Sequence, residues 1–156
     1  MKQVIEKKRV LFICTHNSSR SQMAEGLLND LYGNYCEAYS AGTAPSNVNP
    51  YAIKVMKEIG IDISNYRSKS IKEFRNMKFD YVVTVCDHAK ETCPFFLGAN
   101  NYIHSGFRDP SEFKGKEDDI IAEFRHVRGE IKEWIEKTFG DFDERVKYEG
   151  YEGVAT

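Results

Sequence analysis

The chain has 156 residues and a formal net charge of −2, and 41% of its residues are hydrophobic. This length fits one domain with a buried core. Acidic residues are interleaved with the basic ones, which argues against a nucleic-acid-binding surface. No apolar run reaches the roughly 18 residues that a membrane span needs, and the first ten residues lack the apolar segment of a signal peptide. We therefore expect a cytoplasmic protein that binds neither nucleic acid nor membrane.

The first expected element is a buried strand that leads into a polar loop and a helix. Residues 10–13 (Val-Leu-Phe-Ile) are all apolar, which is typical of a strand that is buried on both faces. Small and polar residues follow at 14–19, and apolar residues then recur with helical spacing over residues 20–32. Gly33 and Asn34 are expected to end this helix, because both tolerate the left-handed backbone found at helix ends.

A strand, a tight polar loop and a helix N-terminus together form an anion-binding site. Backbone N–H groups of the loop can point inward, and the helix adds its positive dipole end. Cys14 opens the loop in this positive potential, which favours its thiolate. Arg20 can hold two oxygens of a tetrahedral oxyanion, and Ser21 can donate a hydrogen bond to the sulfur. The residues expected to bind the oxyanion are Thr15, His16, Asn17, Ser18, Ser19 and Arg20.

The rest of the chain continues the alternation of strands and helices. Strands are expected at residues 35–41, 79–85 and 101–104, with Cys36 as a packing residue. A helix begins after Asn49 as N-cap and ends at Gly60, a short helix covers 71–77, and a long last helix ends at Gly140. Residues 1–140 are expected to form the single domain, and residues 141–156 an acidic, flexible tail.

This alternation predicts an α/β fold, a four-stranded parallel sheet with helices on both faces. Ligands of such sheets bind beyond the carboxyl ends of the strands. Three polar segments emerge at that edge: the Cys14 loop, Cys86 after the third strand, and Asp109 after the fourth. Their convergence argues against the simpler alternative, in which Cys14 is structural and Arg20 is solvated.

Cys86 and Cys93 suggest a second chemistry. On a helix they would be about 10.5 Å apart along the axis, beyond the roughly 7 Å between Cα atoms that a disulfide allows. A bond between them would require the segment to loop or unwind. Two unrelated buried thiols, or a metal held by His88 with both cysteines, are the alternatives. With scattered histidines and no Cys-x2-Cys pair, the redox interpretation is favoured, and no metal site is expected.

The chain resembles the thioredoxin-coupled arsenate reductases, which share the fold of the low-molecular-weight protein tyrosine phosphatases. The resemblance covers roughly residues 8–138. The motifs that carry it are VLFICTHNSSRSQMAEG, YSAGT, VNPYAIKVMKEIGIDIS, VVTVCDHAKETCP, GFRDP and EFRHVRGEIKEWI. The Cys14 and Asp109 motifs suit either branch, whereas the Cys86/Cys93 motif belongs to the reductases.

The resemblance implies a three-cysteine relay that reduces arsenate to arsenite. Cys14 would attack arsenic with Asp109 as general acid, while Arg20 and the loop amides stabilise charge and Ser21 supports the thiolate. Cys86 would then attack Cys14, and Cys93 would attack Cys86. Thioredoxin would reduce the final Cys86–Cys93 disulfide. We expect a monomer without a tightly bound cofactor.

Departures from the family pattern leave alternatives open. His16 and Ser19 stand where some relatives carry Gly and Cys. Some relatives bind potassium beside the loop, but the charges of Arg67 and Lys69 argue against a cation there. A protein tyrosine phosphatase is the second candidate function, although Ser111 follows the Asp-Pro pair where many phosphatases carry an aromatic residue. A non-catalytic module that senses oxyanions or oxidants is a third.

Overall fold

The computed structural model describes residues 6–87, 96 and 98–155, with side chains up to residue 141. The elements follow one another as β1 (Lys8–Cys14), α1 (Arg20–Tyr32), β2 (Cys36–Gly42), α2 (Pro50–Lys57), the 3-10 helix η1 (Ile71–Phe74), β3 (Phe79–Thr84), β4 (Ala99–His104), the 3-10 helix η2 (Pro110–Glu112) and α3 (Glu117–Ala155).

The strands form one four-stranded sheet in the order β2-β1-β3-β4, and every neighbouring pair is parallel. From β1 the chain passes first to β2 on one side and later to β3 on the other. Such a switch point opens a crevice at the carboxyl end of the strands, where ligands bind. Cys14 is the last residue of β1 and lies at this point.

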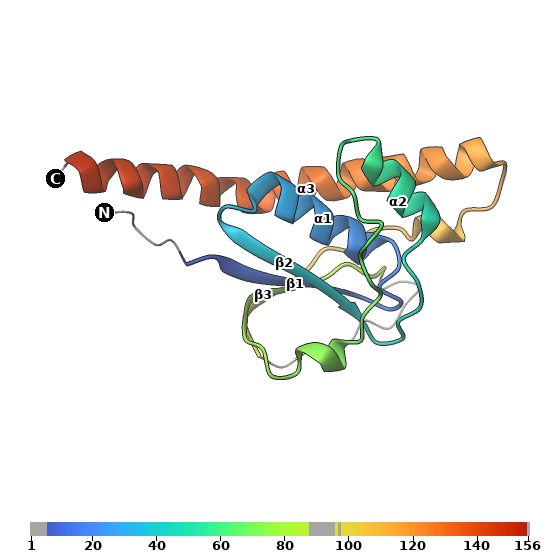
Figure 1. Ribbon diagram of the computed structural model, residues 1–156, viewed down its shortest axis with the longest axis horizontal. Helices are drawn as coiled ribbons and strands as arrows, with labels where there is room; N and C mark the ends of the chain where they lie inside the picture. Colours follow the sequence, from blue (N-terminus) through green and yellow to red (C-terminus); the bar gives the residue numbers. More distant parts are fainter. Residues whose placement is uncertain (1–5, 88–95, 97, 156) are drawn as a thin grey trace.

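Helices cover both faces of the sheet, as the sequence predicts. The three α-helices lie on one face (Figure 1), where Phe12 of β1 packs with Leu27, Val55 and Phe124, all fully buried. On the other face, η1 brings Phe74 against Phe79 of β3. Full burial of one large apolar side chain is worth about 1.5–3 kcal/mol, so these contacts anchor the two central strands, β1 and β3, between the layers.

The predicted elements agree with the structure except at several of their ends. Asn49 caps α2 as expected, because its side chain accepts a hydrogen bond from the Tyr51 N–H at 2.8 Å. The helix ends at Lys57, however, and a turn leads to Gly60 with a positive φ of 80°. The short helix expected over residues 71–77 is a single 3-10 turn, Ile71–Phe74.

The expected helix end at Gly140 is wrong, because α3 continues through it to Ala155 (Figure 1). A glycine inside a helix costs only about 1 kcal/mol relative to alanine, and the flanking Glu, Lys and Arg residues are good helix formers. Glu117, Asp118 and Asp119 in its first turn complement the helix dipole. Across the part of the chain that the structure describes, every helix is too short or too polar to cross a membrane.

Candidate active site

The loop between β1 and α1 wraps around the Cys14 sulfur. Asn17 adopts a positive φ of 48°, and its backbone N–H donates to the sulfur at 3.2 Å. The Ser21 hydroxyl lies 2.8 Å from the same sulfur and accepts a hydrogen bond from Asn17 Nδ2 at 2.8 Å. Because that hydroxyl already accepts a hydrogen bond, its own proton is available to the sulfur. When Cys14 is a thiolate, the Asn17 N–H and the Ser21 hydroxyl can both donate to it and stabilise its charge.

The loop carbonyls turn away from the sulfur toward the segment after β2. Three of them accept backbone hydrogen bonds at 2.8–3.2 Å: Thr15 from Ala44, His16 from Ser46, and Ser18 from Asn49. In a trans peptide, the next N–H points opposite to the carbonyl. The N–H groups of residues 16, 17 and 19 therefore face inward, which is the arrangement of an anion-binding nest.

Gly42, at the end of β2, allows this close contact. A Cβ built at this position would lie 2.5 Å from the Thr15 carbonyl oxygen and 2.9 Å from the Asn17 nitrogen. The glycine lies in the sequence motif YSAGT. Its role depends on the close approach of the loop backbone at Thr15 and Asn17, which lie more than 20 residues earlier in the chain. Sequence reasoning assigned it none.

Arg20 is buried, with 3% of its surface exposed, so the solvated arginine of the simpler alternative is absent. Its Nη1 donates to the Phe107 carbonyl at 3.0 Å, and its Nη2 lies 3.5 Å from Asp109 Oδ2. The other Asp109 oxygen, Oδ1, accepts hydrogen bonds from the N–H and hydroxyl of Ser111 at 2.9 and 2.7 Å. The charged side chains from α1 and from the loop after β4 are thus held together.

A cavity of about 200 Å³ lies between these groups, and its lining residues are Cys14, His16, Ser18, Ser19, Arg20, Ser46, Asp109 and Ser111. Ser19 precedes α1 without making a side-chain cap, and its buried hydroxyl has no hydrogen-bond partner among the described residues. Thr15 and Asn17 are not in the lining; Asn17 acts on the site through its backbone N–H and through its side chain, which donates to Ser21. Sequence reasoning missed Ser46 and gave Ser111 no role in the site.

Cys86 lies next to the end of β1. It is fully buried, and its sulfur is 3.9 Å from the carbonyl oxygen of Ile13, the residue before Cys14. Cys86 is disulfide-bonded, whereas Cys14 and Cys36 are free thiols. Cys93 lies outside the described residues. Burial, and secondarily the charge of Asp80, raises the pKa of Cys36 to about 11, which agrees with a packing role.

Comparison with known proteins decides the family. The family described as low molecular weight phosphotyrosine protein phosphatase matches residues 9–149. The chain belongs to this family. Within it, the arsenate reductase of Halalkalibacterium halodurans is 45% identical over 137 residues, 88% of this chain and 98% of the relative. The arsenate reductase of Staphylococcus aureus is 46% identical over 133 residues, 85% of this chain and 97% of the relative.

Solved structures agree with this placement. An arsenate reductase in its phosphate-binding state superposes with a TM-score of 0.74 at 34% identity, covering 86% of this chain and 98% of the other. A thioredoxin-dependent arsenate reductase of Corynebacterium glutamicum has a TM-score of 0.57 at 30% identity, covering 84% of this chain and 61% of that one. The predicted membership of the phosphatase superfamily is confirmed.

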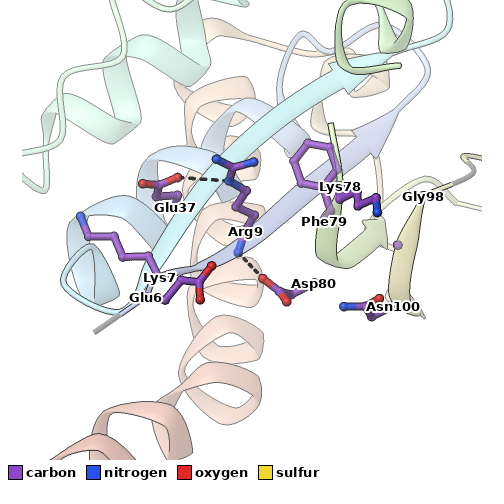
Figure 2. A pocket seen from close by; sticks show the side chains of 10 residues that line it. Glu6, Lys7, Arg9, Glu37, Lys78, Phe79, Asp80, Gly98 and Asn100 are labelled. Carbon is purple, nitrogen blue, oxygen red and sulfur yellow. Dashed lines mark hydrogen bonds and ion pairs between the residues drawn. The ribbon is translucent and has the colours of Figure 1, made fainter. Parts of the chain in front are cut away.

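A second, wider cavity of about 550 Å³ lies at the amino ends of the strands, away from the family's loop (Figure 2). Two of its acidic side chains have partners at Arg9: the Arg9 side chain lies 3.7 Å from Glu37, and the Arg9 backbone N–H donates to Asp80 at 2.9 Å. None of its lining residues is a cysteine. Among the described residues, no cluster of His, Cys, Asp and Glu could hold a metal ion.

Proposed function

We propose that this protein reduces arsenate to arsenite with Cys14, Cys86 and Cys93 acting in turn and thioredoxin as the reductant. The observation that carries the proposal is the cavity in which the Cys14 sulfur, the Arg20 guanidinium and the Asp109 carboxylate meet. Its size and inward N–H groups suit a tetrahedral oxyanion. The arsenate reductases among the relatives point to arsenate as that oxyanion.

The first step joins Cys14 to arsenic. The thiolate, held by Ser21 and the Asn17 N–H, attacks arsenic and forms a sulfur–arsenic bond. An arsenic–oxygen bond breaks, and Asp109, protonated as the carboxylic acid for this step, gives the departing hydroxyl a proton so that it leaves as water and Asp109 remains as the carboxylate. Arg20 and the loop amides stabilise the negative charge that develops on the remaining oxygens.

The second step reduces arsenic. The Cys86 thiolate attacks the Cys14 sulfur, so a Cys14–Cys86 disulfide forms and the sulfur–arsenic bond breaks. The electron pair of that bond stays on arsenic, which leaves as arsenite. The position of Cys86 supports this step, because its buried sulfur lies 3.9 Å from the carbonyl oxygen of Ile13, the residue that precedes Cys14 in β1.

The third step regenerates Cys14. The Cys93 thiolate attacks Cys86, frees the Cys14 thiolate and leaves a Cys86–Cys93 disulfide, which the dithiol of thioredoxin reduces. Two observations support it. Cys86 forms a disulfide in which neither Cys14 nor Cys36 takes part, and we propose Cys93 as its partner. A neighbouring structure is that of a thioredoxin-dependent arsenate reductase.

The test is arsenate-dependent NADPH consumption in the presence of thioredoxin and thioredoxin reductase. The wild-type protein is expected to consume one NADPH per arsenite formed, and Cys14→Ser is expected to be inactive. The control is Cys36→Ser, which changes a buried thiol far from the cavity and is expected to retain turnover. Arsenate-independent consumption, or full activity of Cys14→Ser, would contradict the proposal.

A second candidate is hydrolysis of aryl phosphates, favoured by the family and by a Cys14–Arg20–Asp109 site that would hold a phosphoryl group equally well. Here water would hydrolyse a Cys14 phosphoryl intermediate, and Cys86 would have no part. Parallel assays with an aryl phosphate separate the two. Cys86→Ser is expected to abolish arsenate reduction and to spare any hydrolysis.

A further inference from the structure

A largely buried lysine lies behind the Cys14 loop. The Lys69 side chain is 14% exposed, and its ammonium donates to the Arg67 carbonyl at 2.8 Å. It also lies 3.6 Å from Oε1 of Glu25, a side chain on α1 that is 11% exposed. The same oxygen accepts a hydrogen bond from the Ser40 hydroxyl of β2 at 2.9 Å. The neighbouring charge, Arg67, points away and pairs with Glu73.

This ion pair fixes the segment 67–69 against the base of the loop. The Lys69 backbone N–H donates to Asn17 Oδ1 at 2.8 Å. Gln22 Nε2 lies 2.8 Å from the same Oδ1 and 3.0 Å from the Arg67 carbonyl. Asn17 is the residue whose side chain holds Ser21 and whose N–H points at the Cys14 sulfur. A continuous chain of hydrogen bonds therefore joins the lysine to the sulfur.

We propose that Lys69 is a positioning residue for the nucleophile: by bridging the Arg67 carbonyl to Glu25, its ammonium keeps Asn17 and Ser21 aimed at Cys14. The proposal rests on the proposed function in so far as Cys14 is the attacking group. Asn17 benefits from such support because its φ of 48° lies in the left-handed region, which even asparagine adopts less often than the right-handed one.

Burying these two charges costs free energy, which argues that the Lys69–Glu25 pair does more than stabilise the fold. Burial lowers the pKa of Lys69 and raises that of Glu25, so both charges lose hydration that their attraction offsets only in part. Apolar residues of similar volume often stabilise a fold as well as a buried ion pair does. Apolar residues could not, however, hold the Arg67 carbonyl and the Glu25 carboxylate in fixed positions, as the Lys69 ammonium does.

The first test is the alkylation rate of Cys14 by iodoacetamide, followed by mass spectrometry. Lys69→Met is expected to slow alkylation at least about tenfold, since small misplacements of a reacting group have effects of this size. The double variant Lys69→Met/Glu25→Gln removes both charges and leaves no buried, unpaired carboxylate. It is expected to recover thermal stability while Cys14 alkylation stays slow. The matched control, Lys72→Met, removes an exposed lysine of η1 and is expected to change neither.

The second test is rescue by a free cation. Lys69→Ala leaves a space beside the Arg67 carbonyl and the Glu25 carboxylate, oxygens that can accept methylammonium or potassium. Either ion at high concentration is expected to speed Cys14 alkylation in Lys69→Ala and to leave the wild type unchanged. Wild-type rates in Lys69→Met, or a double variant that recovers alkylation together with stability, would overturn the positioning role. So would a failure of both cations to rescue a folded Lys69→Ala.

The alkylation readout separates this inference from the proposed function. If the wild type fails to reduce arsenate while the Lys69 variants slow Cys14 alkylation, the relay is wrong and the positioning role stands. If arsenate reduction is found and the Lys69 variants alkylate normally, the positioning role is wrong and the relay stands.

Discussion

The Ser21 hydroxyl lies 2.8 Å from the Cys14 sulfur while it accepts a hydrogen bond from Asn17. The Asn17 amide uses one acceptor position of the hydroxyl, and the hydroxyl proton can be donated to a Cys14 thiolate, which has no proton of its own to give. Ser21→Ala removes that donor from a buried site. A hydrogen bond to a charged group is worth about 1.5–3 kcal/mol. We expect arsenate reduction and Cys14 alkylation to slow by about 10- to 100-fold. The exposed Thr43→Ala serves as control, and an unchanged alkylation rate in Ser21→Ala would remove the hydroxyl from this role.

Gly42→Ala tests the backbone contact between β2 and the loop. The added methyl group would meet the Thr15 carbonyl at 2.5 Å, so the loop must shift. We expect a stability loss of about 1–3 kcal/mol and weaker phosphate binding by calorimetry. Gly129→Ala is the matched control, because a Cβ there meets no atom within 4 Å and should stabilise α3 by about 1 kcal/mol. Unimpaired phosphate binding in Gly42→Ala would show that the loop tolerates the shift.

Asp109→Asn separates oxyanion binding from proton transfer. Asparagine keeps the shape and can still accept the Ser111 hydrogen bonds, but it cannot supply a proton as a carboxylic acid does. Loss of a general acid typically slows chemistry by about 10²- to 10⁴-fold. We expect that loss in single-turnover arsenite release, with phosphate binding weakened little. The adjacent Glu112→Gln is expected to behave as wild type, and a fully active Asp109→Asn would exclude the acid role.

The local sequence pattern was enough to predict those parts of the site that are formed by a single continuous segment. The apolar residues 10–13 and the helical spacing after Arg20 located β1 and α1, with the latter's bounds as observed. The parallel topology then predicted that Asp109 would approach Arg20, which lies 3.5 Å away. By contrast, the Gln22 side chain donates to the carbonyl of Arg67, a residue 45 positions later in the chain. Hydrophobic periodicity in the sequence does not predict a polar contact of this kind. The end of α3 was misplaced because a helix-breaking glycine was given more weight than its flanking helix formers.

Cys93→Ser tests the order of the relay. Without the last thiol, Cys14 and Cys86 should complete one reaction and stop as a mutual disulfide. We expect about one equivalent of arsenite per protein, no sustained NADPH consumption, and a Cys14–Cys86 linkage in peptide mass spectra. Cys86→Ser should instead stop before arsenite release. Normal multiple turnover by Cys93→Ser would contradict the relay, whereas arsenite from Cys86→Ser would contradict its second step.

Glu58 predicts how stability depends on pH. It joins α2 to α3 through Arg125 at 2.6 Å and Arg128 at 3.0 Å. Hydrogen bonding from Arg125, with a contribution from Arg128, lowers the pKa of Glu58 from 4.5 to about 2. Because the folded-state pKa is the lower one, the pair stabilises the protein fully above about pH 4.5, and this contribution is lost as pH falls toward 2.

Glu58→Gln should therefore lower the unfolding free energy by about 1 kcal/mol at pH 7, since the carboxylate is partly exposed and screened. The deficit relative to wild type should shrink below about pH 4.5 and disappear near pH 2. Urea unfolding at several pH values measures both quantities. Glu133→Gln, which breaks only the exposed pair with Lys137 within α3, is expected to lose less at pH 7. A deficit in Glu58→Gln that stays constant down to pH 2 would assign the loss to packing, because a packing defect does not depend on the charge of the carboxylate.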